Sequence, residues 1–374
     1  MLRPDQQQRY ARHLSLPGFG LEAQERLLAS SVLLVGAGGL GSPAALYLAA
    51  AGVGRLVVVD DDAVDLSNLQ RQVLHSTDRA GMPKVESAKR TINGINPDVA
   101  VVTINERFTD RNARELVGQC DLVLDGADNF PTRYLVNDAA YFEGKPVVHG
   151  SIHLFEGQCT VFARGRGPCY RCLFPVPPAP GTVPSCAEAG VLGVLPGIIG
   201  TAQATEAIKL LTGIGEPLIG RLLRYDALAM QFQTLSIRRN DGCPLCGGDP
   251  TIHTVREIEY TCVTPAQRAL EIDIAEFEQL RNAGTRCCLL DVREPHEVAG
   301  GTVPGSLHIP LGQLQARIGE LQEWRREEVV CICHVGIRSI RAAELLQQGG
   351  FERVASLRGG FAAWMKSGSV GGEA

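Results

Sequence analysis

The residues best suited to chemistry lie in two short runs, one near each end of the chain. The first is the glycine-rich loop Gly36-Ala37-Gly38-Gly39-Leu40-Gly41, and the second is Cys333-His334-Val335-Gly336-Ile337-Arg338-Ser339. A glycine-rich loop between a strand and a helix lets backbone N–H groups approach a nucleotide phosphate. A loop that surrounds a cysteine with N–H groups and a cation stabilises a thiolate or a persulfide. Two coupled chemistries follow: one activates an acceptor, and the other delivers sulfur to it.

The glycine-rich loop has the spacing of a dinucleotide-binding fingerprint. Gly36, Gly38 and Gly41 follow an apolar run at 32–35 that predicts a buried strand, and a predicted helix comes next. Asp60 ends the following predicted strand, 19 residues after Gly41, where an acid commonly binds ribose hydroxyls. Taken alone, this loop predicts NAD as the ligand.

Charged residues beyond the loop favour ATP with Mg²⁺ instead. Arg71 and Lys84 are cations, Asp128 adds a carboxylate, and such a set suits a triphosphate with a divalent cation. Each has a simpler alternative. Arg71 and Lys84 are explained equally by solvated surface charges, and Asp128 by the N-cap of a helix that starts at Phe130.

Four of the twelve cysteines form two Cys-x-x-Cys pairs in stretches rich in glycine and proline. The pairs are Cys169 with Cys172 and Cys243 with Cys246. Two such pairs predict a tetrahedral zinc site, and four thiolates leave no open coordination position, so the site is expected to be structural. The alternative is two unrelated turns with incidental thiols.

The cysteine loop near the C-terminus is short. Arg338 follows Cys333 by five residues, whereas phosphatases use a related loop with a longer run before the arginine. The shorter loop favours sulfane sulfur over phosphate, with Arg338 adding positive charge. Cys331, on the preceding predicted strand, is expected to pack in the core, as are Cys287 and Cys288.

Two α/β patterns position these motifs. Continuous apolar strands alternating with helices predict a parallel sheet covered on both faces, with strands at 32–35, 56–59, 100–104, 121–125 and 146–149. A turn-rich stretch at 239–251 closes this first domain. The smaller pattern predicts helices at 273–282, 311–320 and 339–348 and strands at 287–292, 329–333 and 354–357. The expected domains are 1–258 and 265–370.

Bulk properties restrict the class of protein. A chain of 374 residues with 45% hydrophobic and 21% charged residues predicts a soluble protein of two domains. The net charge of −5 gives no indication of nucleic-acid binding. No apolar run reaches the roughly 18 residues of a membrane span, and no signal peptide is visible, so we expect a cytoplasmic protein. In that reducing compartment the cysteines are expected to be ligands, catalytic thiols or buried residues rather than disulfides.

Residues 5–250 closely resemble the MoeB/ThiF family of ubiquitin-activating-like adenylyltransferases. The matching motifs are Arg9-Tyr10-x-Arg12-His13, Gly36 to Pro43, Ser67-Asn68-Leu69-Gln70-Arg71-Gln72, Pro83-Lys84 and Asp125-Gly126-x-Asp128-Asn129-Phe130. The resemblance implies a Rossmann-like domain in which the four paired cysteines hold zinc.

The resemblance also implies residue roles. Asp60 would hold the ribose with Gly39 close by, and Asp128 would bind Mg²⁺. Arg12 would reach the nucleotide of the neighbouring subunit in a homodimer. The triphosphate would contact Asn68, Arg71 and Lys84. The complete predicted nucleotide site is Gly36, Gly38, Gly39, Gly41, Asp60, Asp62, Ser67, Asn68, Leu69, Gln70, Arg71, Gln72, Lys84, Asp128 and Asn129.

Residues 265–366 resemble a rhodanese domain. Besides the Cys333 loop, the matching runs are Leu289 to Glu297, Val303 to Pro310 and Leu357-Arg358-Gly359-Gly360-Phe361-x-x-Trp364. Within the first run, Asp291 and Arg293 are expected to brace the domain.

Cys186 lies in Pro184-Ser185-Cys186-Ala187-Glu188-Ala189-Gly190, after a proline-rich stretch. Its position matches that of a nucleophilic cysteine in related activating enzymes, which implies a thioester or an acyl-disulfide link to the activated partner. The alternative is a loop cysteine without a catalytic role.

The sequence therefore predicts a fused adenylyltransferase and sulfurtransferase. By resemblance, ATP adenylylates the C-terminal glycine of a ubiquitin-like sulfur carrier ending in Gly-Gly, and a Cys333 persulfide converts it to a thiocarboxylate. The sulfur donor would be thiosulfate or a cysteine desulfurase. Two alternatives stay open: conjugation of the carrier to lysines through Cys186, and a non-enzymatic scaffold or redox sensor with a degenerate nucleotide site.

Overall fold

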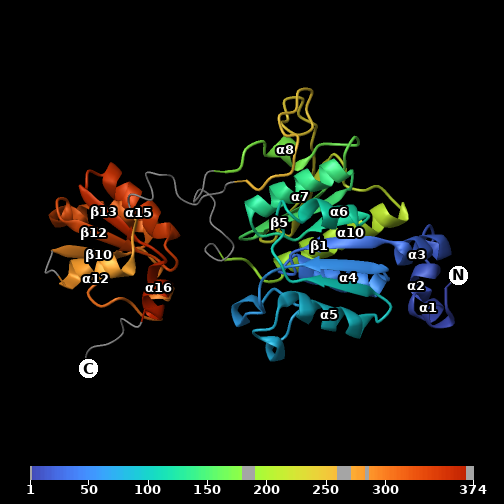
Figure 1. Ribbon diagram of the computed structural model, residues 1–374, viewed down its shortest axis with the longest axis horizontal. Coiled ribbons are helices and arrows are strands. Elements are labelled where there is room, and N and C mark those ends of the chain that lie inside the picture. Colours follow the sequence, from blue (N-terminus) through green and yellow to red (C-terminus); the bar gives the residue numbers. More distant parts are fainter. Residues whose placement is uncertain (1, 179–189, 259–270, 283–285, 368–374) are drawn as a thin grey trace. The chain divides into compact units, whose positions relative to one another are not determined.

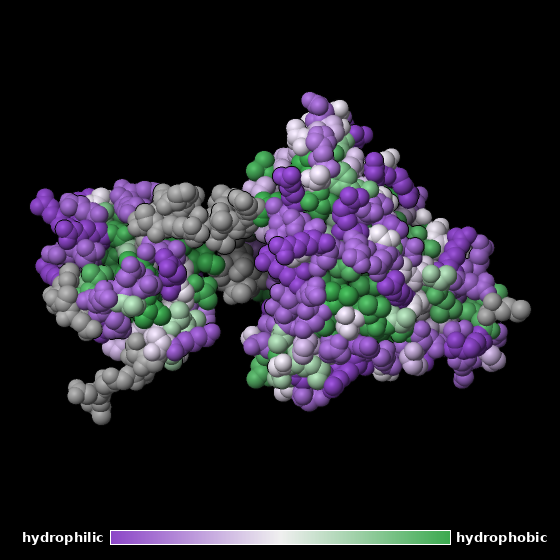
Figure 2. Space-filling model, viewed as in Figure 1, coloured by the Kyte–Doolittle hydropathy of each residue, from purple (hydrophilic) through white to green (hydrophobic). Residues whose placement is uncertain are grey.

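The computed structural model describes residues 2–178, 190–258, 271–282 and 286–367. These residues form two compact units, the first containing the described residues up to 258 and the second those from 271 onward (Figure 1). Among the described residues, no helix is both long and apolar enough to cross a membrane. Hydrophilic residues cover most of the face seen in Figure 2.

The first unit is built on an eight-stranded mixed sheet of order β3-β2-β1-β4-β5-β6-β7-β8. Its parallel part contains β1 (Ser31–Val35), β2 (Arg55–Val59), β3 (Ala100–Ile104), β4 (Leu122–Asp125) and β5 (Val147–His153). These are the five strands that their apolar runs predict. Since β1 lies between β2 and β4, the strand order reverses there, and open α/β sheets bind ligands at the carboxyl ends of strands beside such a point.

The predicted parallel strands are only part of this sheet, which is mixed. Three antiparallel strands extend it: β6 (Glu156–Phe162), β7 (Arg221–Asp226) and β8 (Gln231–Ser236). Every residue of β8 is exposed, and β7 is mostly half-buried. Such strands carry polar residues and lack the continuous apolar run by which buried parallel strands are recognised.

Helices cover both faces of this sheet, as predicted. The helices of the first unit are α1 (Pro4–Arg9), α2 (Ala11–Leu14), α3 (Gly20–Ala29), α4 (Gly41–Ala51), α5 (Lys84–Ile95), α6 (Ala113–Gly118), α7 (Phe130–Glu143), α8 (Tyr170–Leu173) and α10 (Leu195–Thr212), with short 3-10 turns η1 (Leu66–Asn68) and η2 (Thr77–Arg79). One core joins α3, α4, α5 and α10 to one face, and a second core joins α6 and α7 to the other (Figure 1).

The second unit is a five-stranded parallel sheet of order β11-β10-β12-β13-β9. Its strands are β9 (Glu271–Ile272), β10 (Cys287–Asp291), β11 (Leu307–His308), β12 (Glu328–Ile332) and β13 (Arg353–Leu357). Its helices are α12 (Ile274–Asn282), α13 (Pro295–Val298), α14 (Leu311–Arg317), η3 (Ile318–Trp324), α15 (Ile337–Gln348) and α16 (Gly360–Lys366). A core lies on each face, and Cys288 and Cys331 are buried in one of them, as the sequence predicts.

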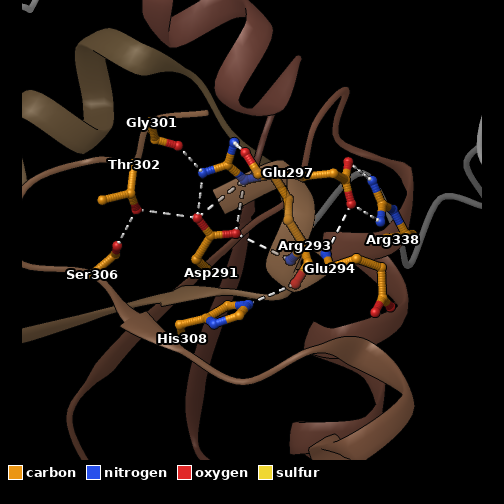
Figure 3. Close-up of polar contacts among 9 residues, drawn as sticks. All are labelled: Asp291, Arg293, Glu294, Glu297, Gly301, Thr302, Ser306, His308 and Arg338. Atoms are coloured by element: carbon orange, nitrogen blue, oxygen red, sulfur yellow. Dashed lines mark hydrogen bonds and ion pairs between the residues drawn. The ribbon is translucent and has the colours of Figure 1, made fainter. Parts of the chain in front are cut away.

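A buried ion pair braces the second unit. The Arg293 guanidinium donates to both carboxylate oxygens of Asp291, with the shortest N–O distance 2.6 Å, and also to the Gly301 carbonyl oxygen (Figure 3). Both side chains are almost fully buried, and Arg293 lies over the Phe361 ring. This confirms the bracing role expected of the two residues.

We predict that Asp291→Asn destabilises the second unit by about 3 to 5 kcal/mol, because it leaves the Arg293 charge buried without its partner. Urea unfolding followed by tryptophan fluorescence measures this directly, since the two tryptophans, Trp324 and Trp364, both belong to this unit. The exposed pair of Arg317 with Glu320 supplies a control: Glu320→Gln is expected to cost less than about 1 kcal/mol. An equal loss in both variants would contradict the prediction.

Candidate functional site

A cavity of about 410 Å³ lies where the carboxyl ends of β1, β2 and β4 meet. Ten of the predicted nucleotide-site residues line it: Gly36, Gly38, Gly39, Asp60, Asp62, Arg71, Gln72, Lys84, Asp128 and Asn129. The sheet thus brings together residues that are up to 93 positions apart in the chain (36 to 129).

Two glycines shape the loop at the base of this cavity. Gly36 has φ +93°, and a Cβ there would lie 2.9 Å from the Gly126 carbonyl oxygen. A Cβ on Gly41 would lie 2.0 Å from the Gly36 carbonyl oxygen, so this glycine allows α4 to start directly against the loop. Gly41 therefore shapes the site without lining the cavity.

Asp60 fixes the loop through its carboxylate. One oxygen accepts the Ala37 N–H at 2.8 Å, and the other accepts the Asp62 N–H at 2.9 Å. Burial raises the pKa of Asp60 above its ordinary value. The group therefore holds the glycine-rich loop and lines the cavity, where its remaining lone pairs are available to a hydroxyl donor.

Lys84 is not a surface charge. Only 4% of the residue is exposed, and its Nζ donates to the exposed Asp62 carboxylate at 2.7 Å. Arg71 is half-buried at the cavity wall and donates to the Ser67 carbonyl oxygen at 3.3 Å. Because Lys84 is buried and paired with Asp62, the interpretation of Lys84 as a solvated lysine is wrong.

Asp128 is not the N-cap of α7. That position belongs to Asn129, whose Oδ1 accepts the Thr132 N–H at 3.0 Å. Asp128 is exposed at the cavity edge, and its only hydrogen bond among the described residues is a 3.3 Å contact with the Asn129 amide. The carboxylate is thus available to a cation at the cavity.

Some predicted residues lie away from the cavity wall. Arg12 is exposed on α2, and the remaining ones that do not line the cavity are Gly41, Ser67, Asn68, Leu69 and Gln70. Ser67 and Asn68 belong to η1, which Asp65 caps by accepting the Ser67 N–H at 2.8 Å.

The sequence interpretation missed other lining residues. Arg107 and Phe108 follow β3, Thr132 and Arg133 lie on α7, and Ile152 lies on β5. Arg107 had a usable signal, because β3 is the parallel neighbour of β2 and its following residues reach the same edge of the sheet. The α7 residues lie one turn after Asn129 and carry no motif of their own.

A buried histidine supports the glycine-rich loop from behind. His75 contacts the Ala37 carbonyl oxygen through Nε2 at 2.9 Å and the Ser87 hydroxyl through Nδ1 at 3.0 Å. Burial lowers the pKa of His75 below its ordinary value. A neutral imidazole there supplies one donor and one acceptor, which matches these two partners.

The four paired cysteines converge on one point. Their sulfur atoms lie within 4.8 Å of one another, with separations of 3.8 Å for Cys169–Cys172, 3.6 Å for Cys169–Cys243 and 3.3 Å for Cys172–Cys246. A tetrahedral site with Zn–S bonds of about 2.3 Å requires sulfur separations of about 3.8 Å. All four are free thiols in the structure, so the donor set and spacing fit zinc.

Local contacts fix the backbone around both Cys-x-x-Cys pairs. Arg171 on α8 forms a buried bidentate ion pair with Asp138 on α7, with N–O distances of 2.7 and 2.8 Å. Beside the second pair, Cys243 and Cys246, a Cβ on Gly247 would lie 2.4 Å from the Asp241 carbonyl oxygen and 2.5 Å from that of Cys243. The tight turn around Cys243 and Cys246 therefore requires glycine.

The second site is the loop between β12 and α15. Cys333 Sγ accepts the Gly336 N–H at 3.1 Å and the Ser339 hydroxyl at 3.4 Å. Ser339 Oγ also lies 2.9 Å from the Gly336 carbonyl oxygen and accepts the Ser356 hydroxyl at 2.9 Å. This confirms the expected N–H contact to sulfur. It adds two buried hydroxyls: that of Ser339, which ends the Cys333 run, and that of Ser356, which no motif indicated.

The loop is closed by the start of α16. The Phe361 N–H donates to the Cys333 carbonyl oxygen at 2.8 Å, and a Cβ on Gly360 would lie 2.3 Å from that oxygen. Cys333 is only 1% exposed, whereas the flanking Val335 and Ile337 are 45% and 39% exposed. The sulfur thus lies at the bottom of a loop with an apolar rim.

Arg338 does not stand alone beside the sulfur. Its guanidinium forms a bidentate ion pair with Glu297 on α13, at 2.6 and 2.7 Å (Figure 3). The hydrogen bonds from Arg338 lower the pKa of Glu297 to about 2. Glu297 therefore offsets part of the positive charge that the sequence assigned to the sulfur loop.

We predict that Glu297 titrates near pH 2 in the folded protein, well below the ordinary value of 4.5. Because the folded pKa is the lower one, the stabilising contribution is complete above about pH 4.5 and is lost as the pH falls toward 2. The ¹³C shift of the labelled carboxyl group gives the midpoint. Arg338→Gln is expected to move the midpoint back toward 4.5, whereas Arg341→Gln, one turn further along α15 and paired with Glu344, is not. An ordinary midpoint in the unmodified protein would contradict the prediction.

Cys186, the third predicted reactive residue, lies outside the described residues. Its role stays a prediction.

Two family models match the chain. The ThiF family matches residues 10–245, and the rhodanese-like domain matches residues 273–367. The first match contains the nucleotide cavity and most of the cysteine cluster, and the second contains the Cys333 loop.

Curated relatives match one or both parts. The chain is 56% identical to the SAMP-activating enzyme E1 of Haloferax volcanii over 67% of this chain and 93% of that protein. It is 44% identical to the probable adenylyltransferase/sulfurtransferase MoeZ of Mycobacterium tuberculosis over 96% of this chain and 92% of that protein. A crystal structure of MccB from E. coli is similar in fold, with a TM-score of 0.59 and 22% identity over 69% of this chain and 77% of that one.

Proposed function

The chain belongs to the ThiF family and carries a rhodanese-like domain, and from this premise we propose that it activates and then thiolates a ubiquitin-like sulfur carrier. It is an adenylyltransferase and a sulfurtransferase. One observation carries the proposal: a single chain holds both the nucleotide cavity and the persulfide-type loop. A relative that matches 96% of this chain has both activities in its name.

In the first step, the carrier's C-terminal carboxylate attacks the α-phosphorus of ATP. A new O–P bond forms, the bond to the β-phosphate oxygen breaks, and pyrophosphate leaves. Arg71 and Lys84, at the cavity wall, would offset the charge that develops on pyrophosphate, and Asp128 would hold Mg²⁺ at the exposed edge. Asp60 would accept hydrogen bonds from the ribose, and Arg12 would act across a homodimer.

In the second step, Cys333 carries sulfane sulfur as a persulfide. Its outer sulfur attacks the acyl carbon, AMP leaves, and an acyl disulfide joins the carrier to Cys333. A thiol then attacks the Cys333 sulfur and releases the thiocarboxylate, so that the thiol is oxidised and the sulfane sulfur is reduced. Cys186 is one candidate for this thiol. The outer sulfur extends about 2 Å beyond Sγ, toward the apolar rim of the loop.

The sulfane sulfur must come from a donor, and thiosulfate and a cysteine desulfurase are the two candidates. We propose the cytoplasm as the compartment, because its reducing conditions keep the thiols of this chemistry free.

We also propose that the four-cysteine cluster holds a structural zinc ion. The protein is expected to contain one zinc ion per chain. Cys243→Ser is expected to lose most of it and to lower the unfolding temperature of the first unit, because the free energy of metal binding contributes to folding. Elemental analysis and calorimetry measure both effects. Cys120→Ser, another buried cysteine of the same unit, is the control for loss of a buried thiol. Zinc retained in Cys243→Ser would exclude the site.

Intact-mass analysis of candidate carriers tests the function. Carriers ending in Gly-Gly are incubated with the protein, ATP, Mg²⁺ and either thiosulfate or a desulfurase with cysteine. The proposal expects the mass change of one oxygen replaced by sulfur, and it expects that change only when ATP is present. A carrier attached to lysines instead would favour the conjugation alternative through Cys186.

A further inference from the structure

The first unit has a second cavity, of about 390 Å³, whose described wall contains four cations and no carboxylate. The cations are Lys145, Arg164, Arg166 and Arg239. The cavity shares no lining residue with the nucleotide cavity and borders the four-cysteine cluster through Cys169 and Cys246. Its volume is in the range of small-molecule sites.

The four cations have no anionic partner in the described part of the chain. Among the described residues, none of them forms an ion pair, whereas other arginines of the same unit, such as Arg171 and Arg224, do so. Arg164 instead donates to the Tyr141 carbonyl oxygen at 3.3 Å and lies over the Tyr141 ring, and Arg239 donates to the Cys246 carbonyl oxygen. Carbonyl oxygens orient a guanidinium but do not neutralise it, and because Arg164, Arg166 and Arg239 are exposed, their charges are available to a ligand from solvent.

The loop after β6 forms part of the wall of the same cavity. It runs from Arg164 through Gly165, Arg166 and Gly167, and all four residues line the wall. Gly165 has φ +76°, and a Cβ there would meet nothing within 4 Å, so the loop is open to a ligand. Within the described residues, the N–H groups of Gly165 and Gly167 donate to no other group. The Arg166 N–H between them donates to the Ala163 carbonyl oxygen, so the loop offers an anion two separate N–H groups rather than a continuous run of them.

The charge balance is consistent with a dianion. A zinc ion with four thiolates would carry a net charge of −2 and would offset two of the four cations beside it. The remaining positive charge matches a phosphate group at neutral pH. Val147, Phe162 and Ala140 supply an apolar wall that inorganic phosphate alone does not need.

From this arrangement we propose that the cavity binds a small organic phosphate. The Arg164–Gly167 loop holds the phosphate group, and the organic part lies against Phe162. The competing explanation is that the four cations only balance the thiolate charge of the metal site.

Calorimetric titration of the full-length, zinc-loaded chain distinguishes the two explanations, with inorganic phosphate and phenyl phosphate as probes. We expect both to bind and phenyl phosphate to bind more tightly. Arg164→Gln combined with Arg166→Gln is expected to weaken binding by roughly tenfold or more, since each removes a charge-assisted hydrogen bond. Arg111→Gln combined with Lys366→Gln removes two exposed cations elsewhere and is expected to change nothing. Zinc content and ATP–pyrophosphate exchange should stay unchanged in both double variants.

Three results would overturn the proposal. If binding disappears in Arg71→Ala but persists in the Arg164 and Arg166 double variant, the probes occupy the nucleotide cavity. If neither probe binds, the cavity is not a phosphate site, and loss of zinc in the double variant would then show that the cations serve the metal site. If inorganic phosphate binds as tightly as phenyl phosphate, the ligand is the free anion rather than an ester.

Discussion

Cys333→Ala is expected to abolish formation of the thiocarboxylate while leaving adenylylation intact. Only Cys333 Sγ occupies the loop in which the Gly336 N–H and the Ser339 hydroxyl stabilise an anionic sulfur. Removal of a covalent nucleophile usually costs at least a thousandfold in rate, on the order of what catalytic serine or histidine losses show. The nucleotide cavity belongs to the other compact unit and keeps every residue that lines it.

The measurement has two independent readouts. Intact mass of the carrier reports sulfur incorporation, and ATP–pyrophosphate exchange reports adenylylation. Cys287→Ser is the matched control, because Cys287 is a half-buried packing residue of the same unit. Thiocarboxylate formed at an undiminished rate by Cys333→Ala would remove Cys333 from the mechanism. Loss of both activities would indicate a folding defect, which tryptophan fluorescence of the second unit detects.

Asp128→Asn is expected to lower ATP–pyrophosphate exchange by about a hundredfold or more, because it removes a charge that would hold Mg²⁺ near the triphosphate. The substitution conserves shape. It also leaves α7 capped, since Asn129 supplies the N-cap hydrogen bond. A loss of exchange activity should therefore reflect weaker binding of Mg²⁺ and not destabilisation of α7. Raising the Mg²⁺ concentration is expected to recover part of the activity, which a purely structural defect would not allow.

Asp61→Asn is the matched control for this variant. Asp61 is an exposed carboxylate that lines the same cavity, and we assign it no role. Its substitution is expected to change exchange by only a few-fold. Persulfide loading of Cys333 should be unaffected in both variants. A large loss in Asp61→Asn with normal activity in Asp128→Asn would transfer the cation-binding role to the cluster of Asp60, Asp61 and Asp62, whose carboxylates also lie within 4.8 Å of one another.

The sequence predicts those features whose pattern lies within a short stretch of the chain. The strands β1, β2 and β4 were recognisable because they are buried on both faces and therefore almost entirely apolar, and the half-buried β3 was recognisable because it is still mostly apolar. The exposed strand β8 had no such signal. The Cys-x-x-Cys pairs were recognisable because metal geometry fixes their local spacing, and the structure places them together across the intervening residues.

Contacts between distant segments had no local signal. The ion pair of Arg338 with Glu297 joins residues 41 positions apart, and Arg107 reaches the nucleotide cavity only because β3 pairs with β2. The N-cap was misplaced for a different reason. Asp and Asn are both good N-cap residues, so Asp128 and Asn129 cannot be distinguished by type, and the choice depends on where α7 begins.

The hydroxyl beside Cys333 has a consequence for the cost of loading and unloading sulfur. Ser339 has one hydrogen and two acceptors within reach, Cys333 Sγ and the Gly336 carbonyl oxygen. The Ser356 hydroxyl can donate to Ser339 Oγ at 2.9 Å or to the Gly336 carbonyl oxygen at 3.4 Å. When the sulfur is a neutral thiol the carbonyl is the better acceptor, and when it is anionic the sulfur is. Rotation of one O–H bond then matches the loop to each state with every heavy atom in place. A change in the charge of the sulfur therefore requires only the movement of the Ser339 hydroxyl proton, so we expect a small reorganisation energy when sulfur is loaded onto Cys333 or released from it.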